Sequence, residues 1–421
     1  MEKLTPTRQR NLTMATMVSV LIVVLFMSFT YWEIQQDDSY ILYTYAKNLA
    51  NGRGYVFNIG QQVNATTSPL YTLLLAGGYA LFRFLPFVTI PLIGHVIGAV
   101  ALFTLCWLLM ESFASEKGTL YPFILPLVFL TLPLLPAAIG METFLALALA
   151  MAAITLYAQE RLVAASLACS LAVLARPDML LLAALLAGYH LIRARRLPPV
   201  KAAAVFLLPL LAWSIFGLIY FGSPIPTSLS AKLAQTEAGL WGGGPVFFDE
   251  LWDFFLSFGM TDLRNILVAA VLCGLVVLLL SFWRWTLFRQ PVFHLILLWA
   301  LVYALVYGVI FHAPGYGWYY TPLALGTALL ATLPVEGLYR LLGRVPRIRV
   351  WILLPAVYLV LVLIGLYVPS LAPVNPVWEQ YGTYKRTAEW LNENAPQGSS
   401  VGAGDIGVLG FYYENGPVSY T

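Results

Sequence analysis

Apolar segments long enough to cross a bilayer recur along almost the whole 421-residue chain. A helix of about twenty apolar residues spans the hydrocarbon core of a membrane. Only 10% of the residues are charged, against roughly 25% in a soluble domain. The sequence therefore predicts an all-α polytopic membrane protein with about eleven crossings, expected near 12–32, 88–110, 119–139, 143–158, 161–175, 179–192, 200–221, 265–285, 291–311, 318–339 and 348–368.

The distribution of basic residues predicts which side of the membrane the N-terminus and each loop lie on. Lys3, Arg8 and Arg10 precede the first apolar segment, and no A-x-A-like cleavage site follows it, which favours an uncleaved anchor with a cytoplasmic N-terminus. The segment 68–84 is shorter, and we expect it to be a juxtamembrane element rather than a crossing. The later basic clusters then all lie on the cytoplasmic side: Arg193/Arg195/Arg196/Lys201, Arg284/Arg289 and Arg340/Arg344/Arg347/Arg349.

This assignment of membrane crossings divides the chain into two regions, with one large loop outside the membrane. Residues 1–368 are expected to form the transmembrane module, with a first extracytoplasmic loop at about 33–87. Residues 369–421 are expected outside the membrane as the start of a small α/β segment, with a helix at Tyr384–Asn394 and a strand at Ser400–Ala403. The predicted location is the plasma or inner membrane of the cell. No basic patch with interleaved aromatic residues indicates nucleic acid as a partner.

Two adjacent carboxylates, Asp37 and Asp38, follow the first crossing. Beyond them, apolar residues recur at helical spacing until Asn51-Gly52-Arg53-Gly54, which predicts a short amphipathic helix in the membrane interface. Acidic residues at a helix start are favoured by the helix dipole, so a cap with a solvated first turn is one interpretation. Two carboxylates exceed what a cap needs, and a lipid-borne substrate would arrive at this surface. The other interpretation is therefore a catalytic pair.

Three further charged residues are candidates. Glu142 stands between two apolar helices, where an ionisable residue suggests function; a carboxylate reaching out from a helix end is the alternative. Arg176, predicted on the outer side, could bind a phosphate with its planar fork, or form a local pair with Asp178. Lys232 in an outer loop could meet a phosphate, or be a solvated loop lysine.

Aromatic residues cluster at a predicted outer turn. They include His312, Trp318, Tyr319 and Tyr320. An interfacial aromatic belt explains most of this cluster, and stacking on sugar rings is the alternative.

Several of these motifs together resemble GT-C membrane glycosyltransferases. Cell-wall arabinofuranosyltransferases are the nearest look-alikes, and lipid A aminoarabinose transferases and protein O-mannosyltransferases are more distant. The segment Asp37–Asn58 with Thr67–Tyr71 is similar to the family's first loop and is the most specific match. Weaker similarities lie at Gly140–Thr143, Ala175–Asp178, Phe221–Pro226, Trp318–Tyr320 and Glu389–Gly407.

The resemblance implies a GT-C-type fold and a polyprenyl-phosphate sugar as donor. It implies transfer to a hydroxyl of a glycan, lipid or protein on the extracytoplasmic face, with Asp37 as the base. Tyr40 in the same motif, with the aromatic turn, is expected to line the substrate site. Asp38 is often Glu in distant relatives and Glu142 is often Asp, which leaves a divalent ion (Mg, Mn, Ca or Zn) at Asp38 and Glu142 an open question.

The residues themselves agree with this chemistry. A base can deprotonate the acceptor hydroxyl, and Arg176 or Lys232 can stabilise the departing phosphate. Direct displacement by the acceptor predicts inversion at the anomeric carbon. The alternative is a carrier or flippase for a lipid-linked sugar, which should place ionisable residues near the middle of the membrane and show internal repeats. The candidate residues lie at one face instead, which favours the enzyme.

Overall fold

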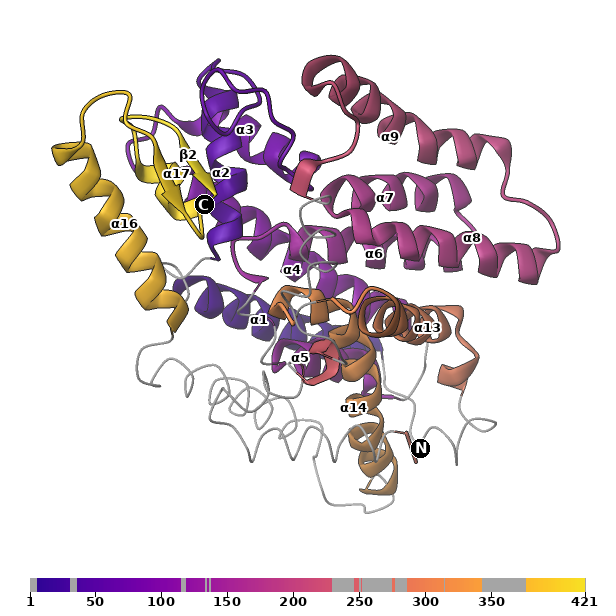
Figure 1. The fold of residues 1–421 in the computed structure, drawn as a ribbon. Coiled ribbons are helices and arrows are strands. Elements are labelled where there is room, and N and C mark those ends of the chain that lie inside the picture. The colour runs from indigo at the N-terminus through magenta and orange to yellow at the C-terminus, as the bar shows by residue number, and fades with distance from the viewer. Residues whose placement is uncertain are drawn as a thin grey trace.

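The computed structural model describes residues 6–30, 36–114, 119–132, 135, 138–228, 246–249, 251, 275–276, 286–313, 315–342 and 376–420. Its elements are mostly apolar helices, drawn in Figure 1. The helices are α1 (Pro6–Thr30), α2 (Asp37–Ala50), α3 (Pro69–Phe82), α4 (Ile90–Phe113), α5 (Tyr121–Leu130), α6 (Thr143–Ala158), α7 (Leu162–Ala175), α8 (Leu180–Ala194), α9 (Val200–Phe221), α13 (Pro291–Leu305), α14 (Thr321–Leu342), α16 (Pro376–Asn394) and α17 (Gly407–Tyr412).

Five helical segments are long and apolar enough to cross a membrane, among the residues described. They are Gln9–Thr30, Ile90–Phe113, Pro177–Ala194, Val200–Phe221 and Pro291–Ile310. Shorter apolar helices lie between them, so the chain is a multi-pass membrane protein. The number of eleven crossings stays a prediction, because most of 265–285 and all of 348–368 lie outside the described residues.

Helix α6 lies at the centre of the largest apolar core. It packs against α4, α7 and α13, and Ala146, Ala150 and Ala153 on it are fully buried. Small residues allow transmembrane helices to approach closely, and dense packing then stabilises the contact. Helix α5 is shorter than the expected segment 119–139, since prolines at 133 and 136 disfavour helical backbone in the residues before them.

The first loop begins with helix α2, whose bounds agree with the spacing of its apolar residues. It ends at Ala50 with Asn51 as its C-cap, and Gly52 follows with a φ of 73°. Buried residues occur on several sides of α2 because it packs against α3 and α17. Segment 68–84 forms α3, a helix of 14 residues.

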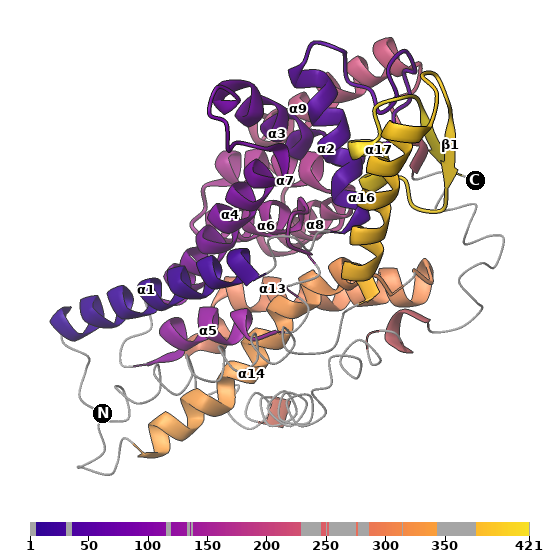
Figure 2. The same cartoon turned by 90° about the vertical axis from the view of Figure 1, so that its left-hand side faces the viewer.

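The C-terminal segment docks on this loop. Strands β1 (Val401–Ala403) and β2 (Val418–Tyr420) pair in parallel, with Val401 opposite Val418, and α17 lies between them in the sequence. Figures 1 and 2 both place α16, α17 and the small sheet beside α2. Segments about 370 residues apart therefore meet at the start of α2.

Candidate functional site

The first carboxylate of the acidic pair joins the first loop to the C-terminal segment. Asp37 is the first residue of α2, and its Oδ2 accepts a hydrogen bond from the Gly407 backbone N–H at 2.7 Å. Its Oδ1 accepts one from the Val408 N–H, also at 2.7 Å. A carboxylate has about four acceptor positions on its two oxygens. These two bonds therefore leave acceptor capacity on Asp37.

Burial sets the protonation behaviour of Asp37. It raises the pKa of the carboxyl from 3.8 to about 6, against the two amide hydrogen bonds, which lower the pKa. The nearby negative charges of Asp405 and Asp38 raise it further. Asp37 is thus ionised at neutral pH, yet it can take up a proton close to neutrality. Such a perturbed carboxylate is typical of functional sites.

Two tyrosines tie the first loop to the turn that carries Glu142. The hydroxyl of Tyr43 on α2 and that of Tyr71 on α3 both donate to the carbonyl oxygen of Gly140, at 2.7 and 2.8 Å. Gly140 has a φ of 81°, a conformation that glycine adopts without strain. Glu142 follows as the N-cap residue of α6 and is 6% exposed, and burial raises its pKa.

Arg176 ends α7 and is held by a buried network. The residue before a proline favours extended backbone, and Arg176 before Pro177 has φ −151° and ψ 125°. Its Nε and Nη2 donate to Asp178, with the shortest distance 2.6 Å from Nη2 to Oδ2. Its Nη1 donates to Thr143 at 2.9 Å and lies 3.9 Å from Glu142 Oε1. The local Arg176–Asp178 pair is therefore present.

Aromatic rings continue this network. The Tyr303 hydroxyl donates to Asp178 at 2.8 Å, and its ring stacks on Tyr307 with centroids 4.3 Å apart. Tyr307 contacts Tyr319 at 5.2 Å, and the Arg176 guanidinium lies 5.9 Å from the Tyr319 ring centroid. These contacts place α7, α13 and the turn before α14 around one ion pair.

A cavity of about 460 Å³ joins these groups. Within the part of the chain that the structure describes, its charged lining side chains are Asp38, Glu142, Asp178 and Arg176. Tyr307, Trp318 and Tyr319 form aromatic walls, and residues of the first loop and of β2 complete it. The cavity therefore lies between the first loop, the acidic turn, the end of α7, the aromatic turn and the C-terminal segment.

The other predicted site residues lie elsewhere. Asp37 does not line the cavity, although its neighbour Asp38 does. Tyr40 is buried among the aromatic rings between α2 and the C-terminal segment, and Tyr320 is buried with its hydroxyl bonded to the Phe247 carbonyl. His312 is exposed and has a φ of 45°. Lys232 lies outside the described residues.

Several residues of the site were not singled out from the sequence. Tyr303 and Tyr307 are four residues apart, one helical turn, but an apolar helix with two tyrosines has no distinctive pattern. Asn58 and Tyr420 also line the cavity. The Asn58 side chain forms two hydrogen bonds with the backbone of Val418 in β2. No local pattern links these residues, since they meet only when the C-terminal segment docks.

A divalent ion would need several ligating side chains to converge. Among the residues that the structure describes, no group of three or more His, Cys, Asp or Glu side chains is placed to hold one. Asp37 already binds two amides, and Glu142 is near Arg176.

No protein-family model matches the chain, and no curated protein matches it in sequence. Solved structures match its fold. The oligosaccharyltransferase of Archaeoglobus fulgidus, in complex with Zn and sulfate, is 14% identical, with a TM-score of 0.58 over 96% of this chain. The match covers only 62% of the oligosaccharyltransferase. ArnT from Cupriavidus metallidurans in the apo state is 13% identical, with a TM-score of 0.55 over 96% of this chain and 84% of ArnT.

A further structure of the archaeal enzyme, AglB, with an inhibitory peptide and a dolichol-phosphate, covers 97% of this chain at 12% identity, with a TM-score of 0.56. The match reaches 64% of the AglB chain. At such identities the likeness concerns the fold. This chain accordingly shares the fold of ArnT and of the archaeal oligosaccharyltransferase.

Proposed function

We propose that this protein is an inverting glycosyltransferase that moves a sugar from a polyprenyl-phosphate donor to an acceptor hydroxyl on the extracytoplasmic face. One observation carries the proposal. A single cavity is lined by a carboxylate of the first loop, by Glu142, by the Arg176–Asp178 pair and by aromatic rings. The fold supports it, because AglB, an oligosaccharyltransferase of the same fold, has been captured with dolichol-phosphate.

The acceptor must lose a proton as it attacks. In the proposed reaction its oxygen forms a bond to the anomeric carbon while the bond from that carbon to the phosphate oxygen breaks. Asp37 takes the hydroxyl proton as general base, a role that typically contributes about 10²–10⁴-fold. Its pKa of about 6 suits a base that works near neutral pH. The amides of Gly407 and Val408 would orient its carboxylate.

Asp38 is the competing base, since it lines the cavity and Asp37 does not. Catalytic hydrogen bonds are often completed only when substrate binds. We therefore do not exclude Asp37 on its position outside the cavity, and we assign the base to Asp37 and an orienting role to Asp38. If Asp37 is the base, its replacement should reduce sugar transfer more than replacement of Asp38. If Asp38 is the base, the order should be reversed.

The departing lipid phosphate needs positive charge. Arg176 is the cation among the described lining residues of the cavity. A guanidinium has five N–H donors, and the contacts to Asp178 and Thr143 use one on each nitrogen. Two donors remain for phosphate oxygens. Lys232 would be a second phosphate ligand. A divalent ion stays a proposal that a chelation assay can decide, and no step above depends on it.

The aromatic walls would hold sugar rings. Tyr319 and Trp318 line the cavity, and apolar faces of sugars stack on such rings. A flippase without chemistry is the alternative. The convergence of the charged groups in one cavity, with a half-buried carboxylate of raised pKa beside it, favours an enzyme.

The test uses the full chain reconstituted in vesicles. Radiolabelled polyprenyl-phosphate sugars are supplied with acceptor extracts, and the release of free polyprenyl phosphate is measured. The expected result is acceptor-dependent release from at least one lipid-linked sugar and none from nucleotide sugars. Translocation of the intact lipid across the vesicle without release of sugar would support the flippase and overturn the proposal.

A further inference from the structure

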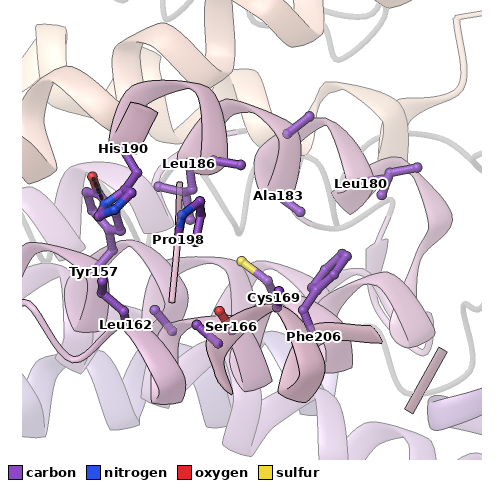
Figure 3. Close-up of a pocket in the computed structure, with 15 residues that line it drawn as sticks. Tyr157, Leu162, Ser166, Cys169, Leu180, Ala183, Leu186, His190, Pro198 and Phe206 are labelled. Carbon is purple, nitrogen blue, oxygen red and sulfur yellow. Dashed lines mark hydrogen bonds between the residues drawn. The ribbon is translucent and has the colours of Figure 1, made fainter. Parts of the chain in front are cut away.

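A second cavity lies within the helices, away from the acidic pair. It has a volume of about 290 Å³ and lies between α7, α8, α9 and the end of α6. Figure 3 shows Tyr157 and His190 at one end, Leu180 and Phe206 at the other, and Ser166 and Cys169 between them. Most of the walls are Ala, Leu and Phe side chains. Such a cavity suits a hydrocarbon chain.

The surrounding helices give a hydrocarbon chain access from the bilayer. Only 11% of the apolar window of α9 is buried inside the protein, and 22% of that of Pro177–Ala194. Both helices are spans by length and composition, so their exposed faces meet lipid rather than water. A lipid tail can therefore enter from the surrounding membrane without opening the protein core.

One end of the cavity carries a polar side chain with unused capacity. His190 is 7% exposed and lines the cavity. Its Nδ1 lies 3.5 Å from the Tyr157 hydroxyl, while its Nε2 is buried and without a hydrogen-bond partner. Buried polar groups are normally satisfied. His190 therefore adds hydrogen-bonding capacity at this end of an otherwise mostly apolar cavity.

Positive charge gathers at the same end. Arg161 precedes α7, directly before the lining residue Leu162. Arg193 at the end of α8, Arg195 and Arg196 in the α8–α9 connection and Lys201 at the start of α9 flank the lining residue Pro198 in the sequence. All five cations are exposed, and Glu160 is the acidic residue next to them. At the opposite end, the nearby cation Arg176 is paired with Asp178 and lines the other cavity. The unequal distribution of positive charge therefore favours binding of an anionic group at the His190 end of the cavity.

We infer that this cavity is a binding site for an anionic membrane phospholipid, with an acyl chain between α7, α8 and α9 and the phosphate headgroup among the basic residues beside His190. Basic pockets between transmembrane helices bind anionic headgroups at the membrane surface. The 18-residue segment 177–194 separates this headgroup position from Asp178 by roughly 25 Å at 1.5 Å per residue. The site is thus distinct from the cavity proposed for sugar transfer.

A basic loop also arises from topology alone, so the test must locate the acyl chain. The full chain in nanodiscs is exposed to phosphatidylglycerol that carries a diazirine near the end of one acyl chain. Labelled peptides are identified by mass spectrometry after irradiation. The expected label lies within residues 157–206, and unlabelled phosphatidylglycerol competes better than phosphatidylcholine. Label spread evenly over all spans, or equal competition by the two lipids, would overturn the inference.

Two kinds of variant test the binding of the acyl chain and the binding of the headgroup separately. Ala187→Leu on α8 and, independently, Ala203→Leu on α9 fill the cavity and should reduce labelling, while Ala212→Leu on the exposed part of α9 should not. Each basic residue near a membrane surface contributes roughly fivefold to anionic-lipid binding. The double variant Arg195→Gln/Arg196→Gln should therefore lower the preference for phosphatidylglycerol by more than about tenfold.

The matched control is Arg53→Gln/Arg83→Gln, which removes two exposed arginines from the first loop and should leave labelling unchanged. Polyprenyl phosphate is added as a third competitor. If it displaced the probe far better than phosphatidylglycerol, the cavity would be a donor site and the inference would be wrong. None of these readouts uses sugar transfer, so failure of the proposed enzyme activity would not affect them.

Discussion

Asp37 and Gly407 are 370 positions apart in the chain, yet the Asp37 carboxylate accepts a hydrogen bond of 2.7 Å from the Gly407 backbone N–H. The Val408 N–H makes the second bond. The same carboxylate that we assign as base is therefore the point at which the C-terminal segment is attached to the first loop. Docking of this segment and the chemistry of Asp37 should consequently be linked.

Gly407→Ala tests the docking. A Cβ at position 407 would collide with the Asp37 backbone carbonyl, so α17 must move away from α2. We expect faster proteolysis and faster amide exchange in residues 376–420, together with reduced sugar transfer. The matched control is Gly382→Ala on α16, where a Cβ meets nothing within 4 Å and alanine favours the helix. Equal protection of residues 376–420 from proteolysis and amide exchange in the two variants would contradict the docking contact.

The pH dependence of kcat/KM reports the base. Asp37 has a pKa of about 6 and must be ionised to accept a proton, so activity should rise with pH through about 6 and fall off in more acidic solution. The negative charge of Asp405 raises the pKa of Asp37. Asp405→Asn should therefore move this acidic limb to lower pH. A limb that stays in place, or moves to higher pH, would remove Asp37 from the role of base.

The buried pair of Arg176 and Asp178 should contribute more to stability than a surface pair. Removing Asp178 leaves a buried guanidinium without its main partner, which typically costs about 3–5 kcal/mol. Asp178→Ala should lower the melting temperature of the detergent-solubilised protein strongly. Tyr303→Phe removes one hydrogen bond to a charged group and should cost about 1.5–3 kcal/mol. Unchanged melting in both variants would show that the pair is not buried as described.

Apolar length and helix-ending residues allowed much of the fold to be predicted from the sequence. The bounds of α6, α7, α8 and α9 agree with the expected segments to within about two residues, because Pro, Gly and charged residues flank each apolar run. The predicted helix after Asp37 is also present as α2. The number of crossings could not be established, because several of these helices are shorter than a span and parts of the chain lie outside the described residues.

The candidate site was only partly predictable. Asp38, Glu142, Arg176, Trp318 and Tyr319 were proposed and share one cavity. Other residues of the site are recognisable only in three dimensions. Tyr303 reaches Asp178 across 125 positions, and the partners of Asp37 are backbone amides, which leave no signature in a sequence. Tyr40, predicted to line the site, instead packs between α2 and the C-terminal segment.

The central claim, that the acidic pair supplies a base through Asp37, is tested most directly by Asp37→Asn beside Asp38→Asn in the reconstituted transfer assay. Gly407→Ala serves as the reference for lost docking with the carboxylate intact. We predict that Asp37→Asn lowers kcat by about 10²–10⁴-fold, well beyond Gly407→Ala, and that Asp38→Asn loses less. Near-normal transfer by folded Asp37→Asn, or a loss confined to Asp38→Asn, would contradict the assignment.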